Sequence, residues 1–192
     1  INRIHRNIFW GARMYKRHGV PLDPDRDERQ GWLGDPAKDA ESDAFNFNVA
    51  AFYSKWLGDI RLDQREDGSI GDISPNFWDW GNGVLWPSVV TIIPEWLYDF
   101  YGDRRVLEEN YEAIRKWMVF HQKRLEPDFT VSKDRYGDWC DVSTMDKGGK
   151  GKAMGNTAMP VLSTAYYYNN CRITARLAKM LGKPDDEKSF TE

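Results

Sequence analysis

Apolar residues recur at helical spacing along most of this chain of 192 residues, and no segment sustains the alternation typical of a β-strand. The clearest case is residues 104–125, where Leu107, Tyr111, Ile114 and Met118 fall on one face of a helix and charged residues fall on the other. The sequence therefore predicts an all-α fold in which any strand is short.

The helical segments are of two kinds. Residues 4–16, 49–65 and 104–125 are amphipathic, which predicts helices with one buried face. Residues 84–101 and 157–181 are apolar or small on most sides, which is typical of a helix enclosed by its neighbours. We therefore expect outer and inner helices to alternate along the chain.

The connections also fall into two groups. Gly102 and Gly182 mark tight turns at which a helix ends. Long loops are expected at residues 19–35, 66–83 and 126–154. Each long loop precedes a helix predicted to be enclosed, so antiparallel packing would place all three loops on one rim.

The first loop obeys this rule if residues 36–48 contain a short inner helix that ends near Asn46. Asn46 and Asn48 are suitable break points before the next outer helix. One unbroken helix over residues 36–65 would instead run roughly 45 Å and separate the first loop from the second. With the break, the pattern predicts half of an α/α toroid or a helical solenoid.

Composition excludes several classes of partner. A net charge of −3 gives no electrostatic footprint for nucleic acid or for an anionic membrane. The longest apolar stretch, residues 84–93, is interrupted by Pro87 and is shorter than the roughly 20 residues that span a bilayer. Cys140 and Cys171 exclude a disulfide scaffold and leave the compartment open. We expect neither a nucleic-acid partner nor a membrane segment.

Both ends of the chain indicate a longer polypeptide. The sequence opens at Ile1 without a methionine, and residues 184–192 resemble the start of another helix. We therefore expect residues 1–192 to be part of a single domain that is truncated at its C-terminal end. The remainder of the same polypeptide would complete it.

Tryptophans and acids are concentrated in the long loops. The predicted rim gathers Trp32, Trp78, Trp80, Trp86 and Trp139 with Glu28, Asp35, Asp79 and Asp138. Indoles stack on the apolar face of a sugar, while carboxylates bind its hydroxyls and transfer the protons of glycoside cleavage. A single tryptophan is more often part of the core, and a mixed charge run is usually a solvated surface. Their convergence from separate loops favours a carbohydrate site.

Other kinds of site are not supported, because the residues that they require do not occur at the necessary spacing. The three histidines are isolated, and no His-Glu-x-x-His or paired-cysteine motif is present for zinc. The Gly-Lys pairs at 149–152 lack the following Ser or Thr of a phosphate loop, and residues 67–71 do not form a Gly-x-Ser-x-Gly motif. In a calcium loop starting at Asp23, Glu28 would occupy the glycine position. We expect no metal and no cofactor.

The order of motifs along the chain resembles a known family. Residues 26–35, Arg-Asp-Glu-Arg-Gln-Gly-Trp-Leu-Gly-Asp, resemble the first catalytic loop of the α-L-rhamnosidases of glycoside hydrolase family 78, and residues 45–57 resemble the helix after it. Further matches in order are Asp67-Gly-Ser with Pro75, Trp80-Gly-Asn-Gly before the Pro94 helix, Tyr101-Gly-Asp, Tyr136-Gly-Asp-Trp and Thr164-Ala-Tyr-Tyr-Tyr. Single pieces are weak, but the ordered set spans nearly the whole chain.

The resemblance implies the N-terminal half of an (α/α)6 barrel and an inverting α-L-rhamnosidase. Its general acid maps onto Glu28, and the general base of the family lies later than these 192 residues. Family positions that hold the sugar map onto Arg26, Asp35, Trp78, Trp139 and, in place of an aspartate, Asn82. Trp86 and Asp138 complete the candidate rim. The expected substrate is a carbohydrate with terminal rhamnose.

Two departures from the family pattern leave alternatives open. The family usually shows Asp-Cys-Pro-Gln before Arg26, whereas this chain has Leu22-Asp-Pro-Asp, so the sugar-binding aspartate is lost or displaced to Asp23. Asn82 keeps acceptor capacity but carries no charge. One alternative is a six-hairpin glycosidase for another deoxy sugar or a uronic acid. The other is a catalytically silent carbohydrate-binding or helical-repeat protein.

Overall fold

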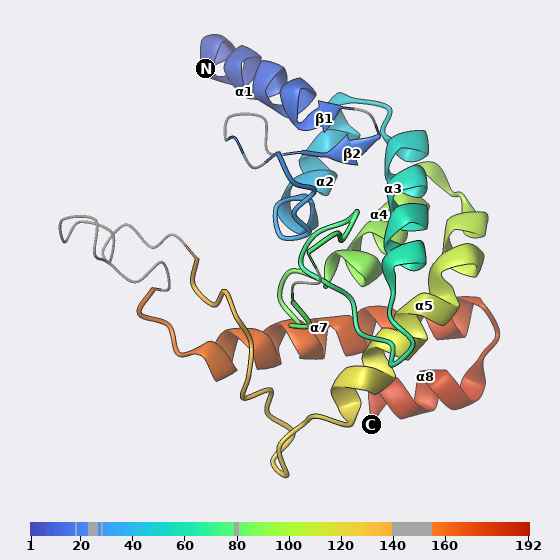
Figure 1. Ribbon diagram of the computed structural model, residues 1–192. Coiled ribbons are helices and arrows are strands. Elements are labelled where there is room, and N and C mark those ends of the chain that lie inside the picture. The colour runs from blue at the N-terminus through green and yellow to red at the C-terminus, as the bar shows by residue number, and fades with distance from the viewer. Residues whose placement is uncertain (18, 23–26, 28, 79–80, 140–154) are drawn as a thin grey trace.

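The computed structural model describes residues 1–17, 19–22, 27, 29–78, 81–139 and 155–192 (Figure 1). Its helices are α1 (Asn2–Tyr15), α2 (Pro36–Asn46), α3 (Ala50–Asp63), α4 (Val89–Tyr101), α5 (Arg104–Gln122), α7 (Met159–Met180) and α8 (Pro184–Thr191). Strands β1 (Lys16–Arg17) and β2 (Val20–Pro21) form a short antiparallel hairpin. The all-α prediction is confirmed.

Helix α4 is the enclosed helix at the centre of the array. It packs against α2, α3, α5 and α7. Its buried residues are Val89, Val90, Thr91, Ile92, Ile93, Pro94 and Leu97. The helix begins later than residue 84, because residues 84–88 form turns around Pro87, whose missing N–H suits a position just before or within a first helical turn. The predicted inner helix is confirmed with a shorter span.

Helix α5 has one buried face, as its periodicity predicts. The buried residues are Val106, Leu107, Asn110, Tyr111, Ile114, Trp117, Met118 and His121. The exposed face carries ion pairs of helical spacing, with Arg104 3.0 Å from Glu108 and Arg115 3.2 Å from Glu112. Helix α3 follows the same rule and buries Tyr53, Trp56, Leu57 and Ile60.

A buried polar network joins α4 to α7. The Thr91 hydroxyl donates to Asn170 Oδ1 at 2.7 Å, and Asn170 Nδ2 donates to Ser88 Oγ at 2.8 Å. All three side chains are inaccessible to solvent. Because buried polar groups are costly unless paired, this network fixes how the two helices align.

Helix α7 has an exposed face in the described structure. The described elements cover one of its faces, whereas Val161 and Tyr168 on another face are 61% and 66% exposed. The described residues enclose one face of α7, so the expectation of an enclosed helix over residues 157–181 stays a prediction for the complete barrel. The packing partners of α7 here are α4, α5 and α8.

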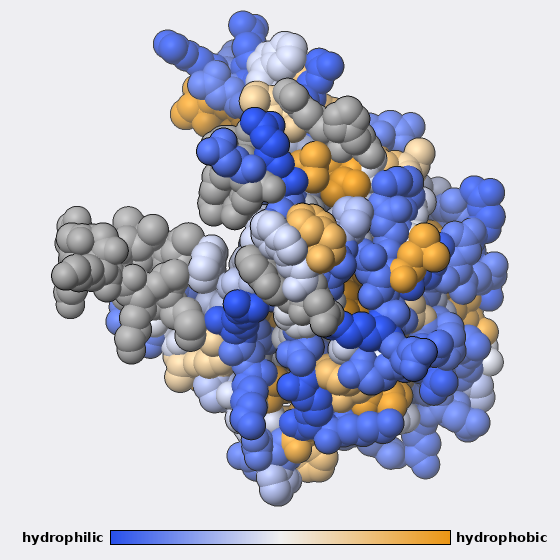
Figure 2. Space-filling view, viewed as in Figure 1, coloured by the Kyte–Doolittle hydropathy of each residue, from blue (hydrophilic) through white to orange (hydrophobic). Residues whose placement is uncertain are grey.

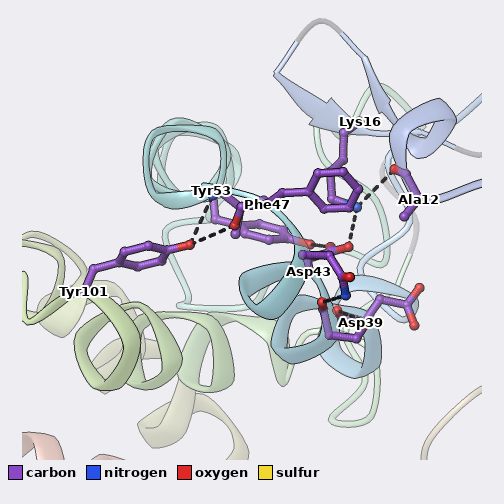
Figure 3. A network of polar contacts seen from close by, with 10 residues as sticks. Ala12, Lys16, Asp39, Asp43, Phe47, Tyr53 and Tyr101 are labelled. Atoms are coloured by element: carbon purple, nitrogen blue, oxygen red, sulfur yellow. Dashed lines mark hydrogen bonds and ion pairs between the residues drawn. The ribbon is translucent and has the colours of Figure 1, made fainter. Parts of the chain in front are cut away.

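The predicted break between α2 and α3 is present, and it is held from both sides (Figure 3). The Tyr101 hydroxyl at the end of α4 accepts from Val49 N at 3.1 Å and donates to Phe47 O at 3.3 Å. These contacts tie the connecting residues to α4. The chain therefore turns between Asn46 and Ala50 instead of continuing as one helix.

A buried ion pair holds the end of α2 (Figure 3). Asp43 Oδ1 lies 2.6 Å from Lys16 Nζ, and Asp43 Oδ2 accepts from the Tyr53 hydroxyl at 2.5 Å. Lys16 Nζ also donates to Ala12 O at 3.1 Å. A carboxylate at 3% exposure is tolerated because both of its oxygens are paired. The network thereby links α1, α2 and α3.

Helix α1 projects from the other helices in Figure 1. None of its residues is buried, and Ile4, Ile8 and Trp10 are more than half exposed. Phe9 stacks on Phe47 with ring centroids 4.6 Å apart, which anchors this helix to the connection between α2 and α3. The side of the molecule seen in Figure 2 is mainly hydrophilic, with separate apolar patches. No helix in the described part of the chain has the length and apolarity to span a membrane.

The helix-ending glycines behave as predicted. Gly102 has φ 67° and donates to Tyr98 O at 2.8 Å, and Gly182 has φ 69°. The left-handed region is open to glycine and costs other residues about 1–2 kcal/mol. A tight reversal at each position lets the following helix return antiparallel.

We predict that Gly102→Ala lowers the free energy of unfolding by about 1–2 kcal/mol, because alanine is strained at this backbone conformation. No atom would obstruct the added methyl group, so the cost is conformational. Gly11→Ala is the matched control, because Gly11 lies within α1 with open space around it. There alanine should raise stability by up to about 1 kcal/mol. Equal effects in denaturant titrations would contradict this account.

Candidate active site

The first and second long loops are joined by backbone hydrogen bonds. Leu33 N donates to Asp72 O and Ser74 N donates to Gly31 O, each at 2.9 Å. A Cβ atom at Gly31 would lie 2.1 Å from Ser74 O, so this approach requires glycine. The buried Trp56 of α3 adds a hydrogen bond from Nε1 to Ser74 O at 3.1 Å. The two loops therefore form one unit on α3.

Rings from the first loop, the turn before α4 and the third loop meet beside this unit. Trp86 stacks on Tyr136 with centroids 3.5 Å apart and an angle of 6° between the ring planes. Trp32 and Trp139 meet Trp86 edge to face at 5.0 and 6.0 Å. A Cβ atom at Gly34 would lie 2.8 Å from the Trp86 ring, so the first loop packs directly on that indole. We call Trp32, Trp86, Tyr136 and Trp139 the aromatic cluster.

Exposure decides which rings can meet a ligand. Trp139 is 43% exposed, and Trp32 and Trp86 are half-buried. Trp78 is 47% exposed, and among described residues its ring partner is Phe77 at 4.7 Å, outside the aromatic cluster. The structure thus brings Trp86 and Trp139 together as predicted, and among the described residues it shows no ring contact between Trp78 and either of them.

Asp72 lies behind the aromatic cluster and was not singled out by the sequence. Its side chain is 1% exposed, and burial raises its pKa to about 6. A hydrogen bond from the Tyr136 hydroxyl and the positive charges of Arg135 and Arg65 act in the opposite direction. The same burial and the nearby carboxylate raise the pKa of Tyr136. A buried carboxyl thus contacts the edge of the aromatic wall.

The third loop is attached by two carboxylates, Asp134 and Asp138. Asp134 Oδ2 accepts from Val84 N at 2.6 Å and from Leu85 N at 3.1 Å, at the turn before α4. Asp138 Oδ2 accepts from Thr157 Oγ1 at 2.9 Å, just before α7. Asp138, which we predict to bind sugar, therefore has one oxygen engaged in holding the loop.

The remaining predicted residues fall into two groups. Asp35 is exposed at the start of α2, and Asn82 is exposed beside a cavity on the second loop. Asp23, Arg26 and Glu28 lie outside the described residues, so their roles stay predictions. No group of three or more His, Cys, Asp or Glu in the described part of the chain is arranged to hold a metal ion.

Gln30 is a candidate that sequence reasoning missed. It is 2% exposed, and neither amide atom has a hydrogen-bond partner among the described residues. It lines a small cavity with Trp32 and Asp35. An unpaired buried amide is costly, and both of its atoms could bind sugar hydroxyls. The sequence places Gln30 in the first loop but does not indicate that its side chain is buried.

An alternating helical array with aromatic rings gathered at its loops is compatible with the class of α/α-toroid glycosidases. The chain belongs to the family described as bacterial alpha-L-rhamnosidase 6 hairpin glycosidase domain, whose profile matches residues 1–192. The architecture is accordingly part of an α/α barrel, as the resemblance implies.

Curated relatives and solved structures agree with this membership. The chain is 36% identical to an alpha-L-rhamnosidase from Streptomyces avermitilis over 100% of its own length and 17% of the relative's, and 32% identical to one from Formosa agariphila over 99% and 20%. The alpha-L-rhamnosidase structure from Dictyoglumus thermophilum matches with a TM-score of 0.88 and 39% identity, over 99% of this chain and 21% of that one. The Streptomyces avermitilis enzyme complexed with L-rhamnose matches with a TM-score of 0.86 and 34% identity, over 99% and 18%. The chain spans about a fifth of the length of the curated relatives it matches.

The raised pKa of Asp72 predicts a specific pH dependence of the free energy of unfolding. An unfolded aspartate has a pKa of about 4, so the folded state binds the proton more tightly between about pH 4 and pH 6. The stability that protonated Asp72 contributes is present below this window and is lost as pH rises through it. Asp72→Asn should therefore gain stability relative to the wild type between about pH 4 and pH 7, measured by denaturant titration.

Tyr136→Phe is the companion variant. This substitution removes the hydrogen bond that lowers the pKa of Asp72, so the pKa of Asp72 in the folded variant should be higher than in the wild type. The free energy of unfolding of the variant should therefore continue to fall up to a higher pH. Parallel pH profiles for the wild type and both variants would contradict the assignment.

Proposed function

We propose that the protein containing this chain removes terminal α-L-rhamnose from glycans or glycosides by an inverting acid/base mechanism. The observation that carries the proposal is the aromatic cluster, in which the first loop, the turn before α4 and the third loop contribute rings to one partly exposed wall. Family membership and the relative solved with L-rhamnose support the same substrate class.

The aromatic cluster suits a deoxy sugar. Rhamnose carries a methyl group where most hexoses carry a hydroxymethyl group, so it presents a larger apolar surface. The edge of Trp139 and the exposed part of Trp86 offer apolar contact for that surface. The predicted polar partners of the hydroxyls are Asp23, Arg26, Asp35, Asn82 and Asp138.

Glu28 is the proposed general acid. A carboxylic acid at this position would protonate the leaving oxygen while a carboxylate elsewhere in the polypeptide activates water on the opposite face of the sugar. Inverting pairs lie roughly 6.5–9.5 Å apart, which leaves room for that water. The family resemblance implies that the base belongs to a segment beyond these 192 residues.

The direct test is the stereochemistry of rhamnose release. The full-length protein would be incubated with an aryl α-L-rhamnoside and followed by proton NMR. The proposal expects β-L-rhamnose to appear first and then to mutarotate. Release of α-L-rhamnose, or no release by folded protein, would exclude the proposed mechanism.

We predict that Glu28→Gln lowers turnover by roughly 10² to 10⁴-fold on rhamnosides with poor leaving groups, because these need proton donation. Aryl rhamnosides that leave easily should lose less. Glu41→Gln, at an exposed position on α2, is the matched control and should change neither. The measurement is the steady-state rate of hydrolysis of both substrate types. An equal loss on both would contradict the assignment of Glu28 as the general acid.

We also predict that Trp139→Ala weakens rhamnose binding with little effect on the free energy of unfolding. Its ring is partly exposed, so its removal leaves no large buried cavity. Trp117→Ala is the contrasting variant, because the fully buried Trp117 should cost about 3–5 kcal/mol of stability. Calorimetry with L-rhamnose and denaturant titration separate the two effects. A Trp139→Ala protein that unfolds easily yet binds normally would show that this ring is part of the core.

A further inference from the structure

A cavity of about 440 Å³ lies between the second and third loops and the C-terminal ends of α3 and α5. Its lining includes four basic residues, Arg65, Arg124, Lys133 and Arg135, and two acidic ones, Asp67 and Asp134. A smaller cavity of about 240 Å³ shares Arg124 and Lys133 with it and also contains Glu126. The larger cavity therefore has an excess of positive charge.

The two carboxylates of the larger cavity are already engaged. Both oxygens of Asp134 accept backbone N–H groups, Oδ2 from the turn before α4 and Oδ1 from Arg135 at 2.6 Å. Asp67 Oδ1 accepts from Ser69 N at 2.9 Å. Hydrogen bonds from Ser69, followed by the charges of Arg65 and Arg124, hold the pKa of Asp67 below its usual range. Asp67 therefore offsets part of the positive charge.

The basic side chains differ in how firmly they are held. Arg65 donates to Ser69 Oγ at 3.2 Å and to Gly81 O at 3.1 Å. The Arg124 guanidinium lies over the Phe120 ring, 4.7 Å from its centroid. Within the described residues, neither Arg124 nor Lys133 forms an ion pair. These two exposed cations border both cavities and are available to a ligand.

His121 supplies an independent sign of a ligand site. It is 4% exposed and lines the smaller cavity, and its Nε2 has no hydrogen-bond partner among the described residues. Burial first, and then the charge of Arg124, lowers its pKa to about 3. Because its ring also hydrogen-bonds the backbone of Gly83, the remaining nitrogen is a buried acceptor without a partner among the described residues, beside the smaller cavity.

The larger cavity adjoins the aromatic cluster through Tyr136. The Arg135 guanidinium lies 5.8 Å from the centroid of the Tyr136 ring, and that ring stacks on Trp86. Asn82, a predicted sugar ligand, also lines the cavity. A sugar unit attached to the rhamnose would therefore lie close to the basic residues.

We propose that this cavity is a subsite for an acidic sugar unit, whose carboxylate or sulfate ester is bound by Arg124, Lys133 and Arg135. Charge-assisted hydrogen bonds from Arg and Lys are the strong contacts for such oxyanions. The inference rests on the proposed function, because the acidic unit is the residue to which rhamnose is attached.

The test compares two disaccharides that differ in one group, rhamnosyl-glucuronic acid and rhamnosyl-glucose. Binding is measured by calorimetry on the full-length protein carrying Glu28→Gln, so that substrate persists. The acidic disaccharide should bind roughly tenfold more tightly, since hydrogen bonds to charged groups contribute about 1.5 kcal/mol or more. No preference would overturn the subsite.

Substitutions test which residues cause the preference for the acidic disaccharide. Arg124→Ala combined with Lys133→Ala should abolish it and leave the affinity for rhamnosyl-glucose unchanged. Lys123→Ala is the matched control, because Lys123 is exposed beside Arg124 but does not line either cavity. Asp67→Asn should increase the preference severalfold, because the amide can still accept from Ser69 N while the negative charge is removed. A preference that survives the double variant would overturn the assignment.

Inorganic sulfate separates a glycan subsite from a site for free anions. At matched ionic strength, sulfate should compete with the acidic disaccharide and leave rhamnosyl-glucose binding unchanged. Sulfate binding without discrimination between the disaccharides would show a site for free anions and overturn the subsite.

Hydrolysis of a neutral aryl rhamnoside by the wild-type protein is measured separately, to distinguish failure of the subsite from failure of the proposed function. If hydrolysis fails and the acidic preference remains, the proposed function alone is wrong; if hydrolysis proceeds without a preference, the subsite alone is wrong.

Discussion

The backbone pairing of the first and second loops is the constraint on which the rest of the site depends. Gly31 and Ser74 approach so closely that any side chain at position 31 would collide with a carbonyl oxygen. Trp56 reaches the same carbonyl from α3, so the paired loops are fixed to a buried helix face. Trp32 follows Gly31 directly and is thereby held against Trp86. The geometry of the aromatic wall is thus set by hydrogen bonds that involve no aromatic ring of that wall.

Tyr136 then joins the aromatic wall to the charged part of the rim. One face of its ring stacks on Trp86, its hydroxyl bonds the buried Asp72, and Arg135 lies beside it. A carboxyl buried to this degree is normally unfavourable, and the hydroxyl with two nearby arginines offsets part of that cost. The apolar and the polar functions of the rim therefore depend on one residue, and a change at Tyr136 would disturb both.

Local pattern was sufficient for the helices and for their order. Periodicity gave α5, asparagines marked the break after α2, and Gly102 ended α4, because each signal is contained within a few residues. The gathering of Trp86 and Trp139 followed from helix alternation. Gln30 and Asp72 could not be found in this way, because their burial is set by partners distant in sequence. The exposed face of α7 has a related explanation. An apolar pattern indicates that a surface can be buried, but it does not indicate which element covers that surface.

We propose that the three loops form one sugar site with Glu28 at the reacting bond. A crystal structure of the full-length protein with L-rhamnose bound would test this arrangement. We expect the sugar against Trp86 and Trp139, with the Glu28 carboxyl within hydrogen-bond reach, about 2.6–3.2 Å, of the anomeric oxygen. Rhamnose bound away from the aromatic cluster, or a Glu28 carboxyl that points away from the sugar, would contradict it.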